Sequence, residues 1–434
     1  MRRKATVALL MALSLFRSAA EGDSLSSKYR QMVFDYNKDL KSAEENMAAA
    51  AEMTEAARAD YFPKLSGNAH FSYTGFPMEL DLEIPSLDQH LHFRGQNLDY
   101  GVGLSLEQPL YAGGFIREQH RKAGIESAMA AERKKMKMSD VAYEADLRYW
   151  AEVANKEMVS IAESFRESVG NLVKVVKERV DAEYADRNDL LMAEVKYNDA
   201  EYSLMLARNN YEVARMSMNM FAGVALDTVL QTDSAVIAIT DNSLNCGEID
   251  NIVAEHPYLK TALHNVGKVT SEGKIADSYF LPYLSFGVDG VYSAPGYNFR
   301  PDMNLNYAVY AKLNVPIFEW GKRKHVKRAS EHNVNTAEYQ REKVEDEIVL
   351  NLKSAYFAYE QAVGQVLLTE NSLEKARENE EVAMARYMEG ESSIIEVLDA
   401  QIYCQQARLN YVRSKFEAQV SRAELIHSAG RYEE

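Results

Sequence analysis

The sequence predicts a mainly α protein with a smaller membrane β part, built from two similar halves. Residues 109–215 align with residues 316–422 at a constant offset of 207, without a gap. Each half contains two short segments of alternating apolar and polar residues, followed by a helical segment of about 70 residues. A period of about 200 residues is too long for a solenoid unit, so it indicates a duplicated half-molecule.

Identical residues recur through the aligned region, and the character of the residues between them is kept. Trp150 aligns with Phe357, and Val141 aligns with Ile348. The identities are Pro109 with Pro316, Gly114 with Gly321, Tyr149 with Tyr356, Arg179 with Arg386, Ala193 with Ala400, Ala200 with Ala407 and Arg215 with Arg422.

The alternating segments predict four β-strands, at about 64–74, 97–107, 283–293 and 304–315. A strand that is apolar on one face fits a soluble sheet with one buried face or a transmembrane barrel with lipid outside. A secretory signal, the lack of a membrane helix and the tyrosine and phenylalanine content of the apolar faces favour the barrel. Proline and glycine are expected at the strand–helix joints, just outside the strands: Pro63, Pro109, Gly114, Pro282, Pro316 and Gly321.

Four strands cannot close a barrel, because the smallest spanning barrels have about eight. An open sheet edge is not tolerated in lipid, since its backbone groups would have no hydrogen-bond partner. Either the strands are soluble, or several chains share one barrel. Three copies, for example, would supply twelve strands.

The helices are predicted to form antiparallel coiled coils at about 115–222 and 322–428. Small residues recur every seven positions in the return arms, at Ala193, Ala200, Ala207 and Ala214 in the first half. Such a repeat is typical of a coiled coil whose helix axes approach closely. Shorter helical segments at Ser24–Tyr61 and Ile249–Tyr279 are expected to complete the lengths of the shorter return arms.

The order along the chain predicts a signal peptide at 1–20, a first repeat at 21–222, an equatorial linker at 223–250 and a second repeat at 251–434. The signal has a basic start, an apolar stretch and a small-residue cleavage site. The chain carries a formal net charge of −16. Removal of the signal's four basic residues would take it to −20, a balance that disfavours nucleic acid or anionic lipid as a partner.

The sequence contains no motif that indicates an enzyme, a cofactor site or a metal site. It has no phosphate-binding glycine loop, no HExxH sequence and no nucleophile elbow. His90 and His92 have a spacing that metal ligands can have, but they fall in an external loop and are interpreted as surface residues. Cys246 and Cys404 form no CxxC pair, and the sequence does not decide whether they are bridged.

The joints and the predicted helix tips carry a resemblance that covers nearly the whole mature chain. The joints are Glu107–Gly114 and Val315–Gly321, and the tips are Arg179–Glu194 and Arg386–Gln401. In this order, and occurring twice, they resemble the TolC-type outer-membrane efflux family. The resemblance implies a homotrimer with a twelve-stranded barrel in the outer membrane and a helical tunnel across the periplasm. It also implies a periplasmic adaptor and, through it, an inner-membrane pump of RND, ABC or MFS type.

The resemblance also implies a gate at the tips. The closing carboxylates of the family correspond to Glu396 and Asp399, and its hydrogen-bonding positions between neighbouring coils correspond to Tyr387 and Asp189. An arginine frequent in the family is replaced here by Ser392. The tips expected to contact the adaptor are Glu183, Tyr184, Ala185, Asp186, Arg187, Asn188, Gly390, Glu391, Ser392, Ser393 and Ile394. Glu183 stands where the family usually has glycine.

The sequence therefore predicts a passive export duct of a Gram-negative-type envelope, in contact with outer-membrane lipid and with no cofactor. Two alternatives are a periplasmic adaptor and a structural coiled-coil protein of the envelope. An adaptor has compact β modules instead of paired hairpins, and a structural coiled coil would not need proline-bounded strands. The sequence determines neither the exported substrate, nor the type of pump, nor whether the adaptor alone opens the gate.

Overall fold

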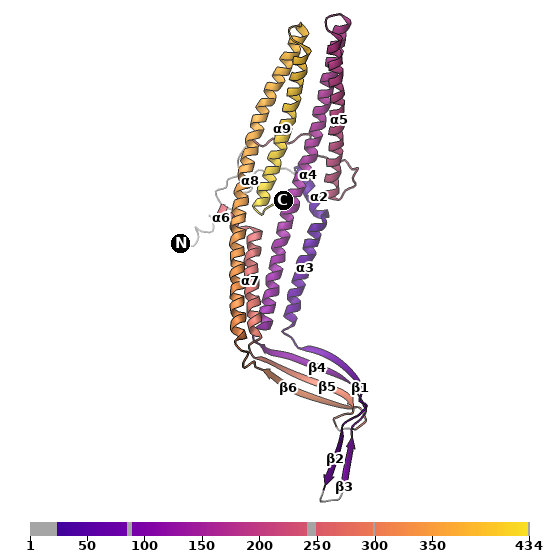
Figure 1. Ribbon diagram of the computed structural model, residues 1–434, viewed down its shortest axis with the longest axis vertical. Helices are drawn as coiled ribbons and strands as arrows, with labels where there is room; N and C mark the ends of the chain where they lie inside the picture. Colours follow the sequence, from indigo (N-terminus) through magenta and orange to yellow (C-terminus); the bar gives the residue numbers. More distant parts are fainter. Residues whose placement is uncertain (1–23, 85–88, 241–248, 298–299, 433–434) are drawn as a thin grey trace, which may run out of the picture. The chain divides into compact units, whose positions relative to one another are not determined.

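The computed structural model describes residues 24–84, 89–240, 249–297 and 300–432, so the expected signal peptide lies outside the described residues. The helices are α2 (Leu25–Tyr36), α3 (Lys38–Ala59), α4 (Phe115–Asp181), α5 (Arg187–Ala222), α6 (Ile249–Glu255), α7 (Pro257–Ser278), α8 (Lys322–Glu389) and α9 (Ile394–Ser428) (Figure 1). The strands are β1 (Lys64–Tyr73), β2 (Glu79–Ile84), β3 (Gln89–Arg94), β4 (Leu98–Ala112), β5 (Tyr283–Ala294) and β6 (Asn304–Asn314).

The chain divides into two compact units, which we describe separately. The helical unit contains Glu132–Leu259, Val344–Glu434 and the chain up to Glu44. The strand unit contains Glu45–Ala131 and Lys260–Lys343, and therefore all six strands of the described residues. The two long helices, α4 with 67 residues and α8 with 68, confirm the predicted helical segments. None of the helices in the described ranges has the length and apolar character needed to cross a membrane.

The strand unit is organised around an antiparallel sheet in the order β1-β4-β5-β6, with β1 and β6 at its edges (Figure 1). Its register brings the apolar positions of all four strands onto one face. Leu106, for example, lies opposite Leu65 on one side and Val288 on the other, and Val288 lies opposite Val309. Strands with one apolar face therefore build one continuous apolar surface, as the alternation predicts.

The described residues of the chain do not cover this apolar face. Phe71 is 73% exposed, Leu104 is 61% exposed and Tyr307 is 76% exposed. A contiguous apolar surface of this kind marks a contact with a partner or with lipid.

Pro109 lies inside β4, whereas the sequence places it just outside the second strand. β4 continues to Ala112, beyond the last residue that pairs with β1, and there it pairs only with β5. The register between β4 and β5 shifts between Pro109 and Tyr111. A proline, which has no N–H to donate, is tolerated at such an irregularity with one free side.

A second sheet, the β2–β3 hairpin, was not expected in the long loop of the first half. Its strands pair antiparallel, with Glu79 opposite Arg94 and Asp81 opposite His92. His92 therefore forms an ion pair with Asp81, which raises the pKa of the imidazole. This agrees with the interpretation of His92 as a surface residue.

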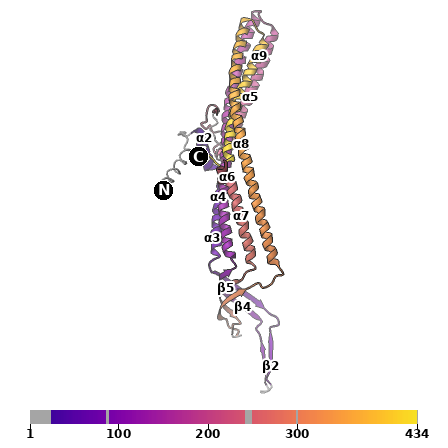
Figure 2. The ribbon, with the colours of Figure 1, turned by 90° about the vertical axis from the view of Figure 1, so that its left-hand side faces the viewer.

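The core of the helical unit is formed where α2, α4, α5 and α9 meet. Tyr29 of α2 donates its hydroxyl to the carbonyl of Met218 at 2.9 Å, and both side chains are buried. The main members of this core are Tyr29, Val33, Val141, Ala145, Tyr149, Val153, Met218 and Val412. The two views in Figures 1 and 2 show α5 running alongside α4, and α9 alongside α8, as predicted for helical hairpins.

The segment after α5 is fixed to α4 by partly buried polar contacts. The Glu157 carboxylate accepts bonds from the Lys415 ammonium at 2.7 and 3.0 Å and from the Val236 N–H at 2.9 Å. The Tyr149 hydroxyl donates to Asp233 at 2.6 Å. These bonds supply the partners that a connecting segment without regular structure needs when it lies against a core.

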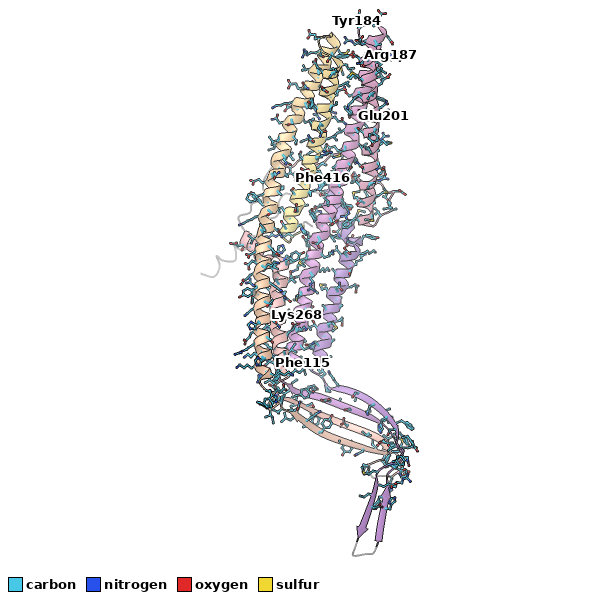
Figure 3. The ribbon with its side chains drawn as sticks, viewed as in Figure 1. Phe115, Tyr184, Arg187, Glu201, Lys268 and Phe416 are labelled. Carbon is cyan, nitrogen blue, oxygen red and sulfur yellow. The ribbon has the colours of Figure 1, made fainter. Side chains whose placement is uncertain are left out.

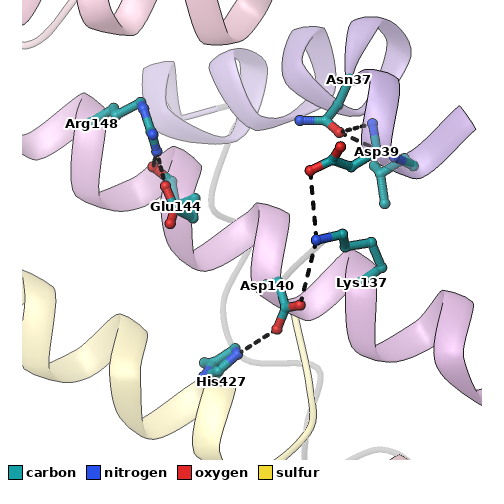
Figure 4. Close-up of polar contacts among 8 residues, drawn as sticks. Asn37, Asp39, Lys137, Asp140, Glu144, Arg148 and His427 are labelled. Carbon is teal, nitrogen blue, oxygen red and sulfur yellow. Dashed lines mark hydrogen bonds and ion pairs between the residues drawn. The ribbon is translucent and has the colours of Figure 1, made fainter. Parts of the chain in front are cut away.

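Charged side chains also connect α3, α4 and α9 (Figure 4). Asp140 of α4 lies 3.0 Å from His427 of α9 and 4.0 Å from Lys137, which in turn lies 3.6 Å from Asp39 of α3. These side chains are partly exposed, so each pair contributes little to stability by itself.

His256, between α6 and α7, is held in its neutral form. It is 4% exposed, and its Nδ1 accepts a hydrogen bond from the Tyr258 N–H at 3.2 Å. A nitrogen that accepts a hydrogen bond carries no proton. Burial is the largest effect and lowers the pKa of His256; a hydrogen bond with the Ser428 backbone raises it, and the nearby His427 lowers it.

We expect the stability of the helical unit to fall below about pH 6.5, the ordinary pKa of histidine. Below that pH the unfolded chain takes up a proton at His256 and the folded chain does not. The loss should not exceed about 1.4 kcal/mol per pH unit for one such group. In thermal unfolding followed by circular dichroism, His256→Asn should show a smaller decrease between pH 7.5 and 5.5. The exposed His325→Asn serves as the control, and an equal decrease in all three proteins would contradict the prediction.

Candidate functional site: the helix tips

The two helix tips have the same backbone construction, one in each repeat. After α4, the N–H of Tyr184 donates to the Arg179 carbonyl at 2.7 Å; after α8, the N–H of Glu391 donates to the Arg386 carbonyl at 2.9 Å. A second bond at each tip spans fewer residues: the Glu183 N–H donates to the Val180 carbonyl and the Gly390 N–H to the Tyr387 carbonyl, both at 3.0 Å. This pair of bonds is the Schellman motif, which satisfies carbonyls at a helix end. Figure 3 labels Tyr184 and Arg187 at the first tip.

The Schellman motif requires a left-handed residue, and the two tips fill it differently. Gly390 has φ 80°, and Glu183 has φ 62°. Glycine adopts this conformation without strain, whereas a side chain there costs about 1–2 kcal/mol. Glu183 therefore replaces the family's usual glycine at the tip position where glycine adopts the left-handed backbone at lower cost.

Arg179 joins the two tips within one chain. Its guanidinium donates to the carbonyl of Tyr387, near the end of α8, and lies 4.6 Å from the centre of the Tyr387 ring. A cation is favourable near a helix C-terminus and over an aromatic face. No local pattern in the sequence assigns a role to Arg179, although its identity with Arg386 across the repeat is visible.

Tyr387 is buried at 4% exposure, and its hydroxyl has no hydrogen-bond partner among the described residues. Burial raises the pKa of Tyr387; Arg179 acts in the opposite direction, and the nearby Asp189 adds to the rise. The structure thus places Tyr387 close to Asp189 without a hydrogen bond between them. Buried hydroxyls are nearly always paired, so this unpaired hydroxyl is a feature that contacts within the described chain do not explain.

The predicted carboxylates Glu396 and Asp399 both lie exposed in the first turns of α9. Glu396 forms a capping box with Ser393: the Ser393 hydroxyl accepts from the Glu396 N–H, and the Glu396 carboxylate accepts from the Ser393 N–H. Glu396 therefore has a local role in starting α9 as well as a charge. Asp399 has no such bond among the contacts described for it.

Asp399 borders a groove of about 400 Å³ between α5 and α9. The walls are mainly aliphatic, and Lys196 and Asp199 add charges. Val195 and Ile395 are 62% and 53% exposed, respectively. The remaining lining residues are Leu191, Met192, Leu398 and Ile402.

Most of the residues expected to contact an adaptor lie on the surface. Tyr184 is 78% exposed, and Glu391 is also exposed. Ile394 differs, because it is 3% exposed and packs into the core of the tips with Leu172, Val176 and Val397. Its side chain is therefore used inside the chain. Ser392, in place of the family's arginine, donates to the Ala383 carbonyl at 3.4 Å.

The joints that connect strands and helices contain several left-handed residues. Gly114 has φ 87° and Gly321 has φ 79°, and Trp320, just before Gly321, has φ 49°. The two glycines correspond across the repeat. Within the described ranges, no group of three or more His, Cys, Asp or Glu side chains could hold a metal ion. Cys404 is buried on α9, and Cys246 lies outside the described residues.

The family model for outer membrane efflux proteins matches residues 30–223 and 249–431. The solvent efflux pump outer membrane protein SrpC of Pseudomonas putida is 21% identical over 385 residues, which are 84% of this chain and 76% of that protein. The alkaline protease secretion protein AprF of Pseudomonas aeruginosa is 21% identical over 287 residues, 64% of this chain and 58% of that protein. The Campylobacter jejuni CmeC outer membrane channel has a similar structure, with TM-score 0.78, 18% identity and coverage of 94% and 85% of the two chains.

These matches define a class of protein, the outer-membrane channels with long helical hairpins. The family model covers both repeats and nearly all of the chain. The chain belongs to the outer membrane efflux protein family. The predicted resemblance to the TolC-type outer-membrane efflux family is confirmed.

The different residues at the two left-handed positions give a reciprocal prediction. Glu183→Gly should stabilise the first tip by about 1 kcal/mol, and Gly390→Glu should destabilise the second by at least as much. Hydrogen exchange of the tip amides measures local opening. We expect about fivefold slower exchange at Tyr184 in the first variant and faster exchange at Glu391 in the second. A change in the same direction in both variants would contradict the prediction.

Proposed function

We propose that this chain is the outer-membrane duct of a tripartite export system, formed by three copies. The observation that carries the proposal is the exposed apolar sheet with two unpaired edge strands, β1 and β6. In lipid, the backbone groups of these edges need partners, which only further strands can supply. Three copies with four strands each supply twelve, enough for a closed barrel.

The duct supplies a water-filled path and catalyses no reaction. A pump in the inner membrane, of RND, ABC or MFS type, would provide the energy through a periplasmic adaptor. The surfaces that best suit an adaptor are the exposed tips at Tyr184–Asn188 and Gly390–Ser393. SrpC is described as part of a solvent efflux pump and AprF as a secretion protein, so family membership leaves the substrate of this chain open.

The periplasmic end of the duct is closed by acidic side chains in this proposal. Glu396 and Asp399 are exposed and lie three residues apart on α9, so three copies would bring six carboxylates together. Like charges around a narrow opening repel one another and favour cations in the path. Arg179, Asp189 and the unpaired Tyr387 hydroxyl lie at the same tips and would set the position of α9 in the closed state.

The two alternatives explain less of the structure. A periplasmic adaptor or a structural coiled-coil protein would leave the exposed apolar face of the four-stranded sheet without a purpose. Both would also disagree with a family model that extends over the two repeats.

Single-channel conductance in planar bilayers tests the duct and its gate together. Wild-type protein should give small, cation-selective openings. Glu396→Ala/Asp399→Ala should raise the conductance by about twofold or more and weaken block by divalent cations, because it removes the ring of charge. Glu374→Ala/Glu378→Ala, two exposed acids of α8, is the matched control and should behave like wild type.

Each other outcome points to a different error. Equal conductance in wild type and the Glu396 and Asp399 variant would keep the duct and remove the gate from these residues. A soluble monomer that never inserts into the bilayer would contradict the duct itself.

A further inference from the structure

The start of α8 carries a run of basic residues that the function described so far does not use. From Val315 to Ser330 there are five Lys or Arg residues and one acid, Glu319, a net charge of +4 (5 − 1) in a chain of −16. The basic residues are Lys322, Arg323, Lys324, Lys327 and Arg328, and all five are exposed. The run directly follows the joint after β6 (Figure 1).

Helix formation does not account for this run. The N-terminus of a helix carries a partial positive charge, so basic side chains in its first turns are unfavourable. The first turn of α8 contains no acidic residue, whereas the first turn of α4 contains Glu118. The cost of this arrangement suggests that the basic residues serve an interaction outside the helix.

Internal ion pairs account for only part of the charge. Arg323 pairs with Asp277 of α7 at 2.8 and 3.0 Å, and this contact lowers the pKa of Asp277. Lys322 lies 3.9 Å from Glu319. Within the described part of the chain, Lys324 and Arg328 have no ion-pair partner. They are four residues apart, so they lie on one side of α8.

Large apolar side chains precede the basic run and are strongly exposed. Ile317 is 94% exposed, Phe318 is 69% exposed and Trp320 is 88% exposed. The rings of Phe318 and Trp320 lie 4.9 Å apart and are held edge to face. Tryptophan and other aromatic residues are enriched where a membrane meets water. In this chain, Ile317, Phe318 and Trp320 lie between the apolar sheet and the basic turns of α8.

We propose that the start of α8 binds the headgroups of anionic phospholipids in the periplasmic leaflet of the outer membrane. Trp320 and Phe318 lie at the boundary between acyl chains and headgroups, and Lys324 and Arg328 contact the phosphates below it. This inference rests on the proposed function, because it requires β6 to lie in the bilayer. It differs from the expectation from net charge, because attraction to a surface depends on the residues within a Debye length of it.

The two tryptophans of the chain allow a direct test. Trp320 is exposed, and Trp150 is 7% exposed in the helical core. The protein is reconstituted into mixed phosphatidylcholine and phosphatidylglycerol vesicles in which one of the two lipids is brominated, because bromine quenches indole fluorescence at short range. The ratio of quenching by brominated phosphatidylglycerol to quenching by brominated phosphatidylcholine gives the lipid preference around Trp320. Trp320→Phe supplies the residual signal of Trp150.

We expect wild-type Trp320 to prefer phosphatidylglycerol at low salt and to lose the preference in about 0.5 M salt. Lys324→Gln/Arg328→Gln should reduce the preference about fivefold for each cation removed. Lys324→Arg/Arg328→Lys keeps both charges and should retain it. Lys375→Gln/Arg377→Gln, with the same charge change farther along α8, should behave like wild type.

Four results would overturn the inference. Equal quenching by both lipids in wild type would leave the duct intact and remove the headgroup site. Absence of quenching in a preparation that conducts ions would place the joint away from the bilayer. Dissociation of the oligomer by Lys324→Gln/Arg328→Gln, with unchanged lipid preference, would show that these cations pair with acids of a neighbouring copy. Failure to insert at all would contradict the proposed function as well.

Discussion

The backbone N–H and C=O groups along β1 and β6 impose the constraint on which the rest of the account depends. Both strands are edges of a sheet whose apolar face is exposed, and in hydrocarbon such edges have no water to bond. The chain by itself is therefore an incomplete membrane structure. Further copies of the chain are needed to hydrogen-bond the backbone groups of these edges. Because each copy contributes four strands, only a few copies can form a barrel of ordinary size.

The duplication then explains why functional features occur in pairs that are not equivalent. Both tips end their long helices with the same hydrogen bonds, but Gly390 fills one left-handed position and Glu183 the other. Both long helices begin after a strand–helix joint, but the first turn of α4 contains Glu118 and the first turn of α8 contains no acid. One backbone plan is thus kept twice, and the side chains that would meet other molecules have diverged.

Much of this could be predicted from the sequence, because the patterns repeat and have a clear period. The alternation in four segments predicted the strands, and the register confirms that their apolar positions share one face. The hairpin of β2 and β3 was missed because its short strands lie within a loop identified only by its length. The sequence predicts Pro109 outside β4, because a strand that is paired on both sides does not tolerate proline. In the structure, β4 continues past its doubly paired part, and the part that is paired on a single side does tolerate proline. The contact of Arg179 with Tyr387 joins residues 208 positions apart, which no local pattern reveals.

Disulfide cross-linking between edge strands tests the central claim most directly. In a background of Cys246→Ser and Cys404→Ala, one cysteine replaces Asn68 of β1 and a second replaces, in turn, each residue from Tyr307 to Ala311 of β6. Directly opposed residues of paired strands are close enough for a disulfide. The account predicts that one or two registers give a covalent species that stops at three copies in native membranes. Monomers at every register, or a ladder that extends beyond three copies, would contradict it.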